Sequence, residues 1–125
     1  MKGTSLPAWE LPVTPTLVVS TAIATRDYQD VHHDRDLAQS YGSKDIFLNI
    51  LTTTGLVQRY VTDSLGDVDL AGIALRLGAP AYPGDELVFS GTRDGDTVSV
   101  VGAVSQGDHV TATVTLREAQ HGPLQ

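Results

Sequence analysis

An aspartate and a histidine five residues apart, Asp27 and His32, are the side chains of this sequence best suited to acid–base chemistry. They lie in the polar segment 26–34, where six of the nine side chains are ionisable. A carboxylate and an imidazole that hold one water molecule can take a proton from it and deliver a proton elsewhere. We therefore expect Asp27 and His32 to activate a water molecule. The alternative is a surface loop in which Asp27 caps the next turn and His32 is solvated.

Other kinds of chemistry find less support in the sequence. The 125 residues contain no cysteine, which excludes disulfides, thiolate metal sites and cysteine nucleophiles and favours a cytoplasmic protein. His32, His33 and Asp34 are adjacent, so their side chains diverge, and we expect no metal site. The net charge of −7 argues against nucleic-acid binding, and no apolar run approaches the roughly 18 residues of a membrane helix.

The elements on either side of the polar segment must position its side chains. The β-branched run Leu17–Ile23 predicts a strand that leads into it. Asp34 or Asp36 is expected to begin a short helix that Gly42 ends. Residues 1–15 contain three prolines and are expected to form an extended lead-in. The length predicts one domain that spans the whole chain.

The longest periodic stretch runs from Asp45 to Leu65 and predicts a long helix. Its apolar residues recur three and four positions apart, which is typical of one buried helix face. Ser43 or Asp45 is the expected N-cap, and Gly66 is the expected end. Gly55 lies in the middle of this helix and predicts that another backbone passes close to it.

The remainder of the chain reads as strands joined by tight turns. Arg93-Asp94-Gly95-Asp96 and Gln106-Gly107-Asp108 are typical hairpin turns, so the last three strands are expected to be antiparallel. The expected strands cover residues 73–77, 86–90, 97–104 and 109–116, followed by a tail over 117–125. Together with the first strand they predict an α+β fold: one long central helix wrapped by a five-stranded antiparallel sheet.

This order of elements and residues resembles the MaoC-like hot-dog domains, the fold of the (R)-specific enoyl-CoA hydratases. Asp27, Val31, His32 and Ala38 match the short motif of that family at its spacing. The turn before the last three strands matches as well, through Pro80, Pro83, Gly84 and Asp85.

Some positions depart from the family pattern. Arg26, Gln29 and Asp30 stand where the family has glycine, asparagine and proline. At the start of the long helix, Asn49 and Ile50 replace a His-Gly pair whose backbone N–H binds the enolate oxygen in the family.

A more specific resemblance is to the small subunits of heteromeric steroid side-chain enoyl-CoA hydratases of bacterial cholesterol catabolism. Segments 25–36, 42–51, 55–63 and 107–114 carry it. The resemblance implies that this chain supplies the Asp and the His, while a larger MaoC-like partner helps to form the pocket in an α2β2 heterotetramer. It implies no cofactor, since coenzyme A is part of the acyl-CoA thioester substrate.

The resemblance also implies roles for individual residues. Asp27 is the expected base and His32 the expected second contact to the water, although the reverse division of labour is open. Gln29 is expected to support the loop, and the start of the long helix at Asn49 and Ile50 to bind the enolate oxygen. The cations expected near the phosphates of coenzyme A are Lys44 and Arg59, with Arg26 and Arg35 as further candidates.

Two other functions remain open from the sequence. One is a non-catalytic subunit that only completes the active site of a partner. The other is a hot-dog acyl-CoA thioesterase, which would release free coenzyme A.

Overall fold

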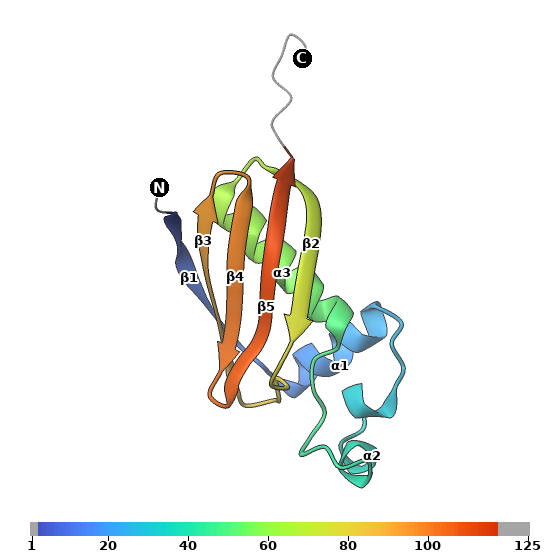
Figure 1. The fold of residues 1–125 in the computed structure, drawn as a ribbon. Helices are drawn as coiled ribbons and strands as arrows, with labels where there is room; N and C mark the ends of the chain where they lie inside the picture. Colours follow the sequence, from blue (N-terminus) through green and yellow to red (C-terminus); the bar gives the residue numbers. More distant parts are fainter. Residues whose placement is uncertain (1–2, 118–125) are drawn as a thin grey trace.

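A five-stranded antiparallel sheet with one long helix across its face forms the body of the molecule (Figure 1). The computed structural model describes residues 3–117. The strands lie in the order β1-β3-β4-β5-β2, and the helix is α3, Ile50–Leu65. This arrangement confirms the predicted α+β hot-dog fold. The strands are β1 Thr4–Pro12, β2 Asp69–Leu77, β3 Glu86–Asp94, β4 Thr97–Val104 and β5 Gly107–Arg117.

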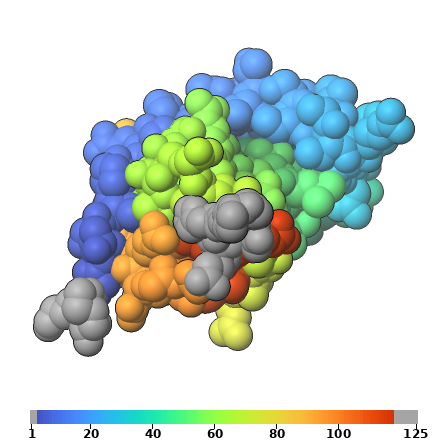
Figure 2. Space-filling view, turned by 90° about the horizontal axis from the view of Figure 1, so that it is seen from above, coloured from blue at the N-terminus to red at the C-terminus, as the bar shows by residue number. Residues whose placement is uncertain are grey.

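The apolar face of α3 packs against the inner face of the sheet. Val57, Tyr60 and Val61 of α3 are buried with sheet residues such as Phe89 and Val114. Each such side chain contributes roughly 1.5–3 kcal/mol when it leaves water, so packing holds a helix whose threonines give it little intrinsic propensity. Viewed from above, α3 (green) lies between the strands (orange to red) and the N-terminal segments (blue) (Figure 2).

The prediction about Gly55 is wrong. A Cβ added there would meet nothing within 4 Å, so no backbone of the described residues passes close to it.

The predicted start of the long helix is also wrong by five residues. The helix begins at Ile50, with Asn49 rather than Ser43 or Asp45 as its N-cap. The preceding residues are extended because their backbone groups bond to other loops: Phe47 N–H donates to the Val31 carbonyl (3.2 Å), and Leu48 N–H donates to that of Ala81 (3.2 Å). The predicted end is confirmed, since Gly66 caps the helix with a φ of 77°.

The predicted strand over Leu17–Ile23 is a helix instead. Helix α1, Pro15–Ala24, is capped by Thr14 and has proline at its first position. It buries Val18 and Ala22, which are four residues apart and therefore on one face. The fifth strand of the sheet is β1, which the expected lead-in over 1–15 contains and which pairs with β3.

The shorter elements follow the sequence more closely. Helix α2, Arg35–Ser40, begins after Asp34, whose Oδ1 accepts the N–H of Leu37 (3.1 Å). The hairpin between β3 and β4 turns at Gly95, and β4 and β5 are joined by a second tight turn. A single turn of 3₁₀ helix, η1 Asp30–His32, precedes α2. The expected tail over 117–125 falls almost entirely outside the described residues.

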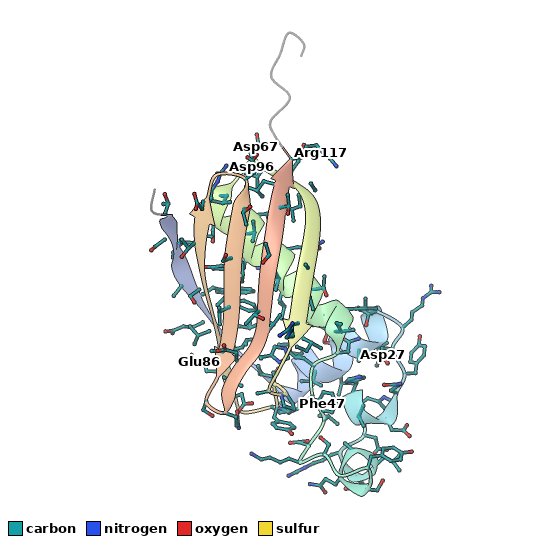
Figure 3. The ribbon with its side chains drawn as sticks, viewed as in Figure 1. Asp27, Phe47, Asp67, Glu86, Asp96 and Arg117 are labelled. Carbon is teal, nitrogen blue, oxygen red and sulfur yellow. The ribbon has the colours of Figure 1, made fainter. Side chains whose placement is uncertain are left out.

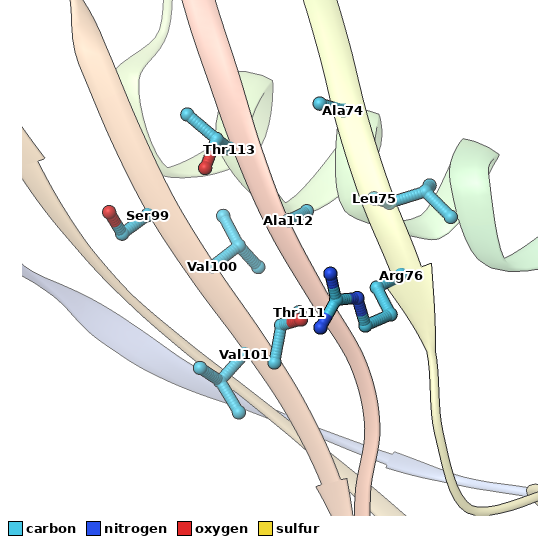
Figure 4. A pocket seen from close by; sticks show the side chains of 9 residues that line it. All are labelled: Ala74, Leu75, Arg76, Ser99, Val100, Val101, Thr111, Ala112 and Thr113. Atoms are coloured by element: carbon cyan, nitrogen blue, oxygen red, sulfur yellow. The ribbon is translucent and has the colours of Figure 1, made fainter.

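The outer face of the sheet carries small and polar side chains. A shallow hollow of about 420 Å³ crosses β2, β4 and β5 there, with Arg76 above Thr111 and α3 on the far side of the sheet (Figure 4). None of the helices in residues 3–117 has the length and apolar character that crossing a bilayer requires.

Candidate active site

Asp27 owes its position to the way in which α1 ends. The N–H of Arg26 donates to the carbonyl of Ile23 (2.9 Å), and the N–H of Asp27 donates to that of Ala22 (2.8 Å). This pair of bonds is a Schellman motif, which requires left-handed backbone at the residue before Asp27. Arg26 has a φ of 60° and meets that requirement in the place where the resembling family has glycine. The turn directs the chain from α1 into η1.

His32 is held by one backbone carbonyl. Its Nδ1 lies 2.8 Å from the oxygen of Phe47, and its ring meets the Phe47 ring edge-on at 4.9 Å. A carbonyl oxygen only accepts hydrogen bonds, so Nδ1 carries the proton. In the neutral ring, Nε2 therefore has a free lone pair. Figure 3 shows Asp27 and Phe47 at the same end of the molecule.

Nε2 of His32 lies next to the carboxylate of Asp27. Nε2 lies 3.5 Å from Asp27 Oδ2, and 8% of the His32 side chain and 24% of the Asp27 side chain are exposed. With the imidazole neutral, both atoms are acceptors, so a water molecule can donate one hydrogen to each. The pair can therefore orient a water molecule and receive its proton.

Asn49 holds the carboxylate from the other side. Its Nδ2 donates to Asp27 Oδ2 (3.2 Å) and to Thr25 Oγ1 (2.8 Å), while its Oδ1 accepts the N–H of Thr52 (3.1 Å). The residue is 2% exposed. Asn49 therefore connects the end of α1, the carboxylate and the first turn of α3.

The structure brings some of the other predicted residues to this place. The backbone N–H of Gln29 donates to Asp27 Oδ1 (3.3 Å), and its side chain is exposed. Ile50 is the first residue of α3 and is half exposed, and first-turn N–H groups have no partner within a helix. A substrate contact for any of these side chains stays a prediction.

The two predicted phosphate-binding cations lie in different places. Lys44 lies over the ring of Tyr82 at 5.4 Å, and Tyr82 meets Phe47 edge-on. Arg59 lies about 15 Å further along α3 than Asn49, since each residue rises 1.5 Å. It stacks on Trp9 and pairs with Asp63 at 3.4 Å.

Sequence reasoning missed a hollow beside the site. A depression of about 390 Å³ is lined by Tyr28, Gln29, Asp30, Val31 and Tyr41. It also missed Thr25 and Phe47, whose hydroxyl and carbonyl hold Asn49 and His32. Thr25 ends α1, and a polar residue at the end of a helix is a recognisable signal. The signal was missed because the β-branched run before Thr25 predicts a strand. In residues 3–117 no group of three His, Asp or Glu side chains could hold a metal ion.

A second buried histidine lies away from this pair. His109 Nδ1 donates to the carbonyl of Ala79 (2.8 Å), and its Nε2 accepts from Thr53 Oγ1 (2.8 Å). Burial lowers the pKa of His109, against the opposing effects of the Ala79 hydrogen bond and the charge of Asp85. The imidazole is therefore neutral and connects β5 to α3.

Comparisons with known proteins agree with this fold. Residues 2–120 match the family model described as MaoC like domain. The 3-oxo-4,17-pregnadiene-20-carboxyl-CoA hydratase beta subunit of Mycobacterium tuberculosis is 60% identical, over 91% of this chain and 93% of its own length.

Solved structures also have this fold. A chain of the ChsH1-ChsH2 complex from Mycobacterium tuberculosis superposes with a TM-score of 0.87 at 54% identity, over 94% of this chain and 98% of that chain. An (R)-hydratase from A. caviae superposes with a TM-score of 0.81 at 16% identity, over 94% and 96%, and shows the shared fold. A family match of this extent, joined by a relative at 60% identity, makes this chain a member of the MaoC-like domain family.

Proposed function

We propose that this chain is the catalytic subunit of an enoyl-CoA hydratase that adds water to the α,β double bond of a steroid side-chain CoA thioester. The observation that carries the proposal is the distance of 3.5 Å between His32 Nε2 and Asp27 Oδ2, which lets one water molecule contact both groups. The substrate class comes from the relative at 60% identity, whose name specifies a pregnadiene carboxyl-CoA thioester. Cholesterol degradation is the process that such a substrate implies.

The acid–base pair can account for both proton transfers of hydration. Asp27 takes a proton from the water as the water oxygen forms a bond to Cβ, and the double-bond electrons move onto the thioester as an enolate. Cα then receives that proton from Asp27, either directly or after its transfer to Nε2 of His32, so that H and OH have been added overall. This chemistry requires no cofactor or metal.

The developing enolate needs a hydrogen-bond donor. The first turn of α3 offers the N–H groups of Ile50 and Leu51 at the positive end of the helix dipole. Asn49 already accepts the N–H of Thr52, which leaves the N–H groups of Ile50 and Leu51 for the enolate oxygen. Donors placed in advance at such an oxygen are a large source of rate enhancement.

A larger MaoC-like partner subunit fits the surface around the site. Among residues 3–117, seven large apolar side chains are at least 40% exposed. They belong to α1, the segment after it, α2, the first turn of α3 and the end of β2, which gather in the lower part of Figure 1. They are Ile23, Tyr28, Leu37, Tyr41, Ile50, Leu51 and Leu77. Apolar side chains gathered in this way mark interaction or ligand surfaces, which supports association with a partner; the α2β2 stoichiometry comes from the family resemblance alone.

The phosphates of coenzyme A require cations. Lys44 lies on the same side of the molecule as Phe47 and Tyr82 and is the better candidate on this chain. Arg59 is engaged with Trp9 and Asp63. The partner subunit is the other source of phosphate contacts.

The test is hydration of an unsaturated steroid side-chain CoA thioester by the complex with its partner. Asp27→Asn keeps the shape of the side chain and removes the base, so the turnover number is expected to fall by a factor on the order of 10³ or more. Asp63→Asn is the matched control, because it makes the same change at an exposed carboxylate on α3 and is expected to leave turnover unchanged.

Other outcomes favour the other functions. Full activity of Asp27→Asn in an intact complex would contradict the proposal and identify this chain as a scaffold for the site of its partner. Release of free coenzyme A in place of a hydrated thioester would identify a thioesterase.

A further inference from the structure

We infer that Asn49 is a positioning residue for the reaction: it aims the carboxylate of Asp27 and fixes that carboxylate to the first turn of α3. The inference rests on the proposed hydration and adds to it the residue that sets the geometry of the base. It also gives the side chain of Asn49 a role in the protein rather than in binding the substrate.

The hydrogen bonds of Asn49 are directed at the protein. Both hydrogens of Nδ2 are accounted for, one by Thr25 Oγ1 at 2.8 Å and one by Asp27 Oδ2 at 3.2 Å. Oδ1 accepts the N–H of Thr52. At 2% exposure, the amide has little surface to offer to a ligand.

The amide holds the oxygen that matters for the chemistry. Oδ2 of Asp27 receives the Asn49 hydrogen bond, and the same oxygen faces His32 Nε2 at 3.5 Å. The other oxygen, Oδ1, accepts the N–H of Gln29 at 3.3 Å. The carboxylate is therefore held at both oxygens. Without Asn49, it would keep one backbone bond and could rotate toward solvent.

Asn49 also connects two parts of the site. As the N-cap of α3 it fixes the first turn, where Ile50 and Leu51 present N–H groups, and as a donor it fixes the base. The base acts on the water, while the first-turn N–H groups act on the thioester oxygen. A single buried side chain thus sets the distance between the two groups that the reaction needs at once.

Asn49→Ser separates the two tasks of the residue. Serine is as good an N-cap as asparagine, so the helix is expected to remain, with a melting temperature lowered by the loss of the two Nδ2 hydrogen bonds. Serine has no Nδ2, so the base loses its hydrogen bond. In the complex with its partner, the turnover number is expected to fall roughly 10²-fold, the cost of misplacing a reacting group by about 1 Å, while KM changes little.

A second substitution and a double-mutant cycle sharpen the test. Asn49→Asp keeps the cap as well and places a like charge beside Asp27, so its loss of turnover is expected to exceed that of Asn49→Ser. In an Asp27→Glu background the carboxylate is already displaced by one methylene, and Asn49→Ser is expected to cost little more. A merely structural role would give additive losses instead.

Thr14→Ala is the control for loss of a helix cap. It removes the cap of α1, where Thr14 Oγ1 accepts the N–H of Leu17 at 3.0 Å, and is expected to lower the melting temperature without changing turnover. Full turnover in Asn49→Ser, or additive losses in the cycle, would overturn the inference and leave the proposed function standing. Absence of hydration by the wild-type complex would overturn both.

Discussion

At the scale of single residues, Arg26 shows how the backbone before Asp27 is set. Its φ of 60° belongs to the left-handed region, in which a side chain with a Cβ costs roughly 1–2 kcal/mol. The two hydrogen bonds that end α1 require this conformation whichever residue occupies the position. The chain therefore tolerates strain one residue before the proposed base.

Arg26→Gly and Arg26→Ala are expected to differ in their free energy of unfolding. Both remove the same guanidinium, and only alanine keeps the strained Cβ, so Arg26→Gly is expected to be more stable than Arg26→Ala by about 1 kcal/mol. Urea unfolding of the two variants, with equal slopes, measures the difference. Equal stability would show that Arg26 leaves the left-handed region in solution.

The site itself is predictable only in part. The spacing of Asp27 and His32 indicates the pair only together with the family motif that it matches, and the structure places Nε2 and Oδ2 3.5 Å apart. Two of the groups that hold the pair give no such signal. The Phe47 carbonyl is a backbone atom and is invisible in a sequence, and Asn49 reaches Asp27 only because α1 and α3 meet at their ends.

At the scale of elements, α1 and β1 show where tertiary packing overrides local preference. Leu17–Ile23 is rich in β-branched residues, yet Thr14 and Pro15 begin a helix there, and Val18 with Ala22 gives it a buried face. Residues 4–12 contain two prolines and still form a strand, because proline is tolerated at a sheet edge. The pair Thr14-Pro15 is the local signal that favours the helix.

The hairpin strands are more predictable. Their turns depend on glycine at fixed positions, as at Gly95 with a φ of 62°, and β4 has the bounds that the sequence predicts. The start of α3 is harder to predict because Ile46 and Phe47 continue the helical period by coincidence. The N–H groups of Phe47 and Leu48 bond to the carbonyls of Val31 and Ala81, which are distant in the sequence, and no local pattern reports such bonds.

The bond between α3 and β5 at Thr53 and His109 makes stability depend on pH. Burial lowers the pKa of His109 in the folded state, whereas in the unfolded chain it is near 6.5. Below about pH 6.5, His109 therefore binds a proton in the unfolded chain but remains neutral in the folded chain. The free energy of unfolding falls as the pH drops, until the folded pKa is passed.

His109→Gln should flatten this dependence. Glutamine does not titrate, so the fall in unfolding free energy between pH 7.5 and pH 5 is expected to be smaller in the variant, at a lower overall stability. Urea unfolding at both pH values gives the comparison. An unchanged slope in His109→Gln would contradict the prediction.

At the scale of the whole molecule, the exposed apolar side chains gather on the segments around the site, while the ends of the strands furthest from the site carry Asp67, Asp96 and Arg117 (Figure 3). The exposed apolar side chains, rather than the charges, distinguish the end that holds the site. The partner is expected to cover the end that holds Asp27, which places the site at an interface.

Leu51→Glu tests whether that end binds the partner. Leu51 is 56% exposed in the first turn of α3, where a negative charge is favourable to the helix, so the fold is expected to remain stable. A charge buried against the partner is costly, and the complex is expected to dissociate in analytical ultracentrifugation. Gln58→Glu makes the same kind of change at an exposed position further along α3 and is expected to assemble normally. An intact Leu51→Glu complex with raised KM would assign the side chain to the substrate.

The two edges of the sheet also differ. In β1 the pairing with β3 shifts register between Leu6 and Trp9, and Pro7 in that interval has no N–H to offer. The opposite edge, β2, contains no proline and pairs regularly with β5 from Gly72 to Leu77. A strand arriving from another chain finds a regular row of backbone groups over residues 72–77 of β2, beyond its own register shift between Leu70 and Gly72. Of the two edges, this one is therefore better suited to pairing with a second chain, and pairing of two such edges would join two sheets.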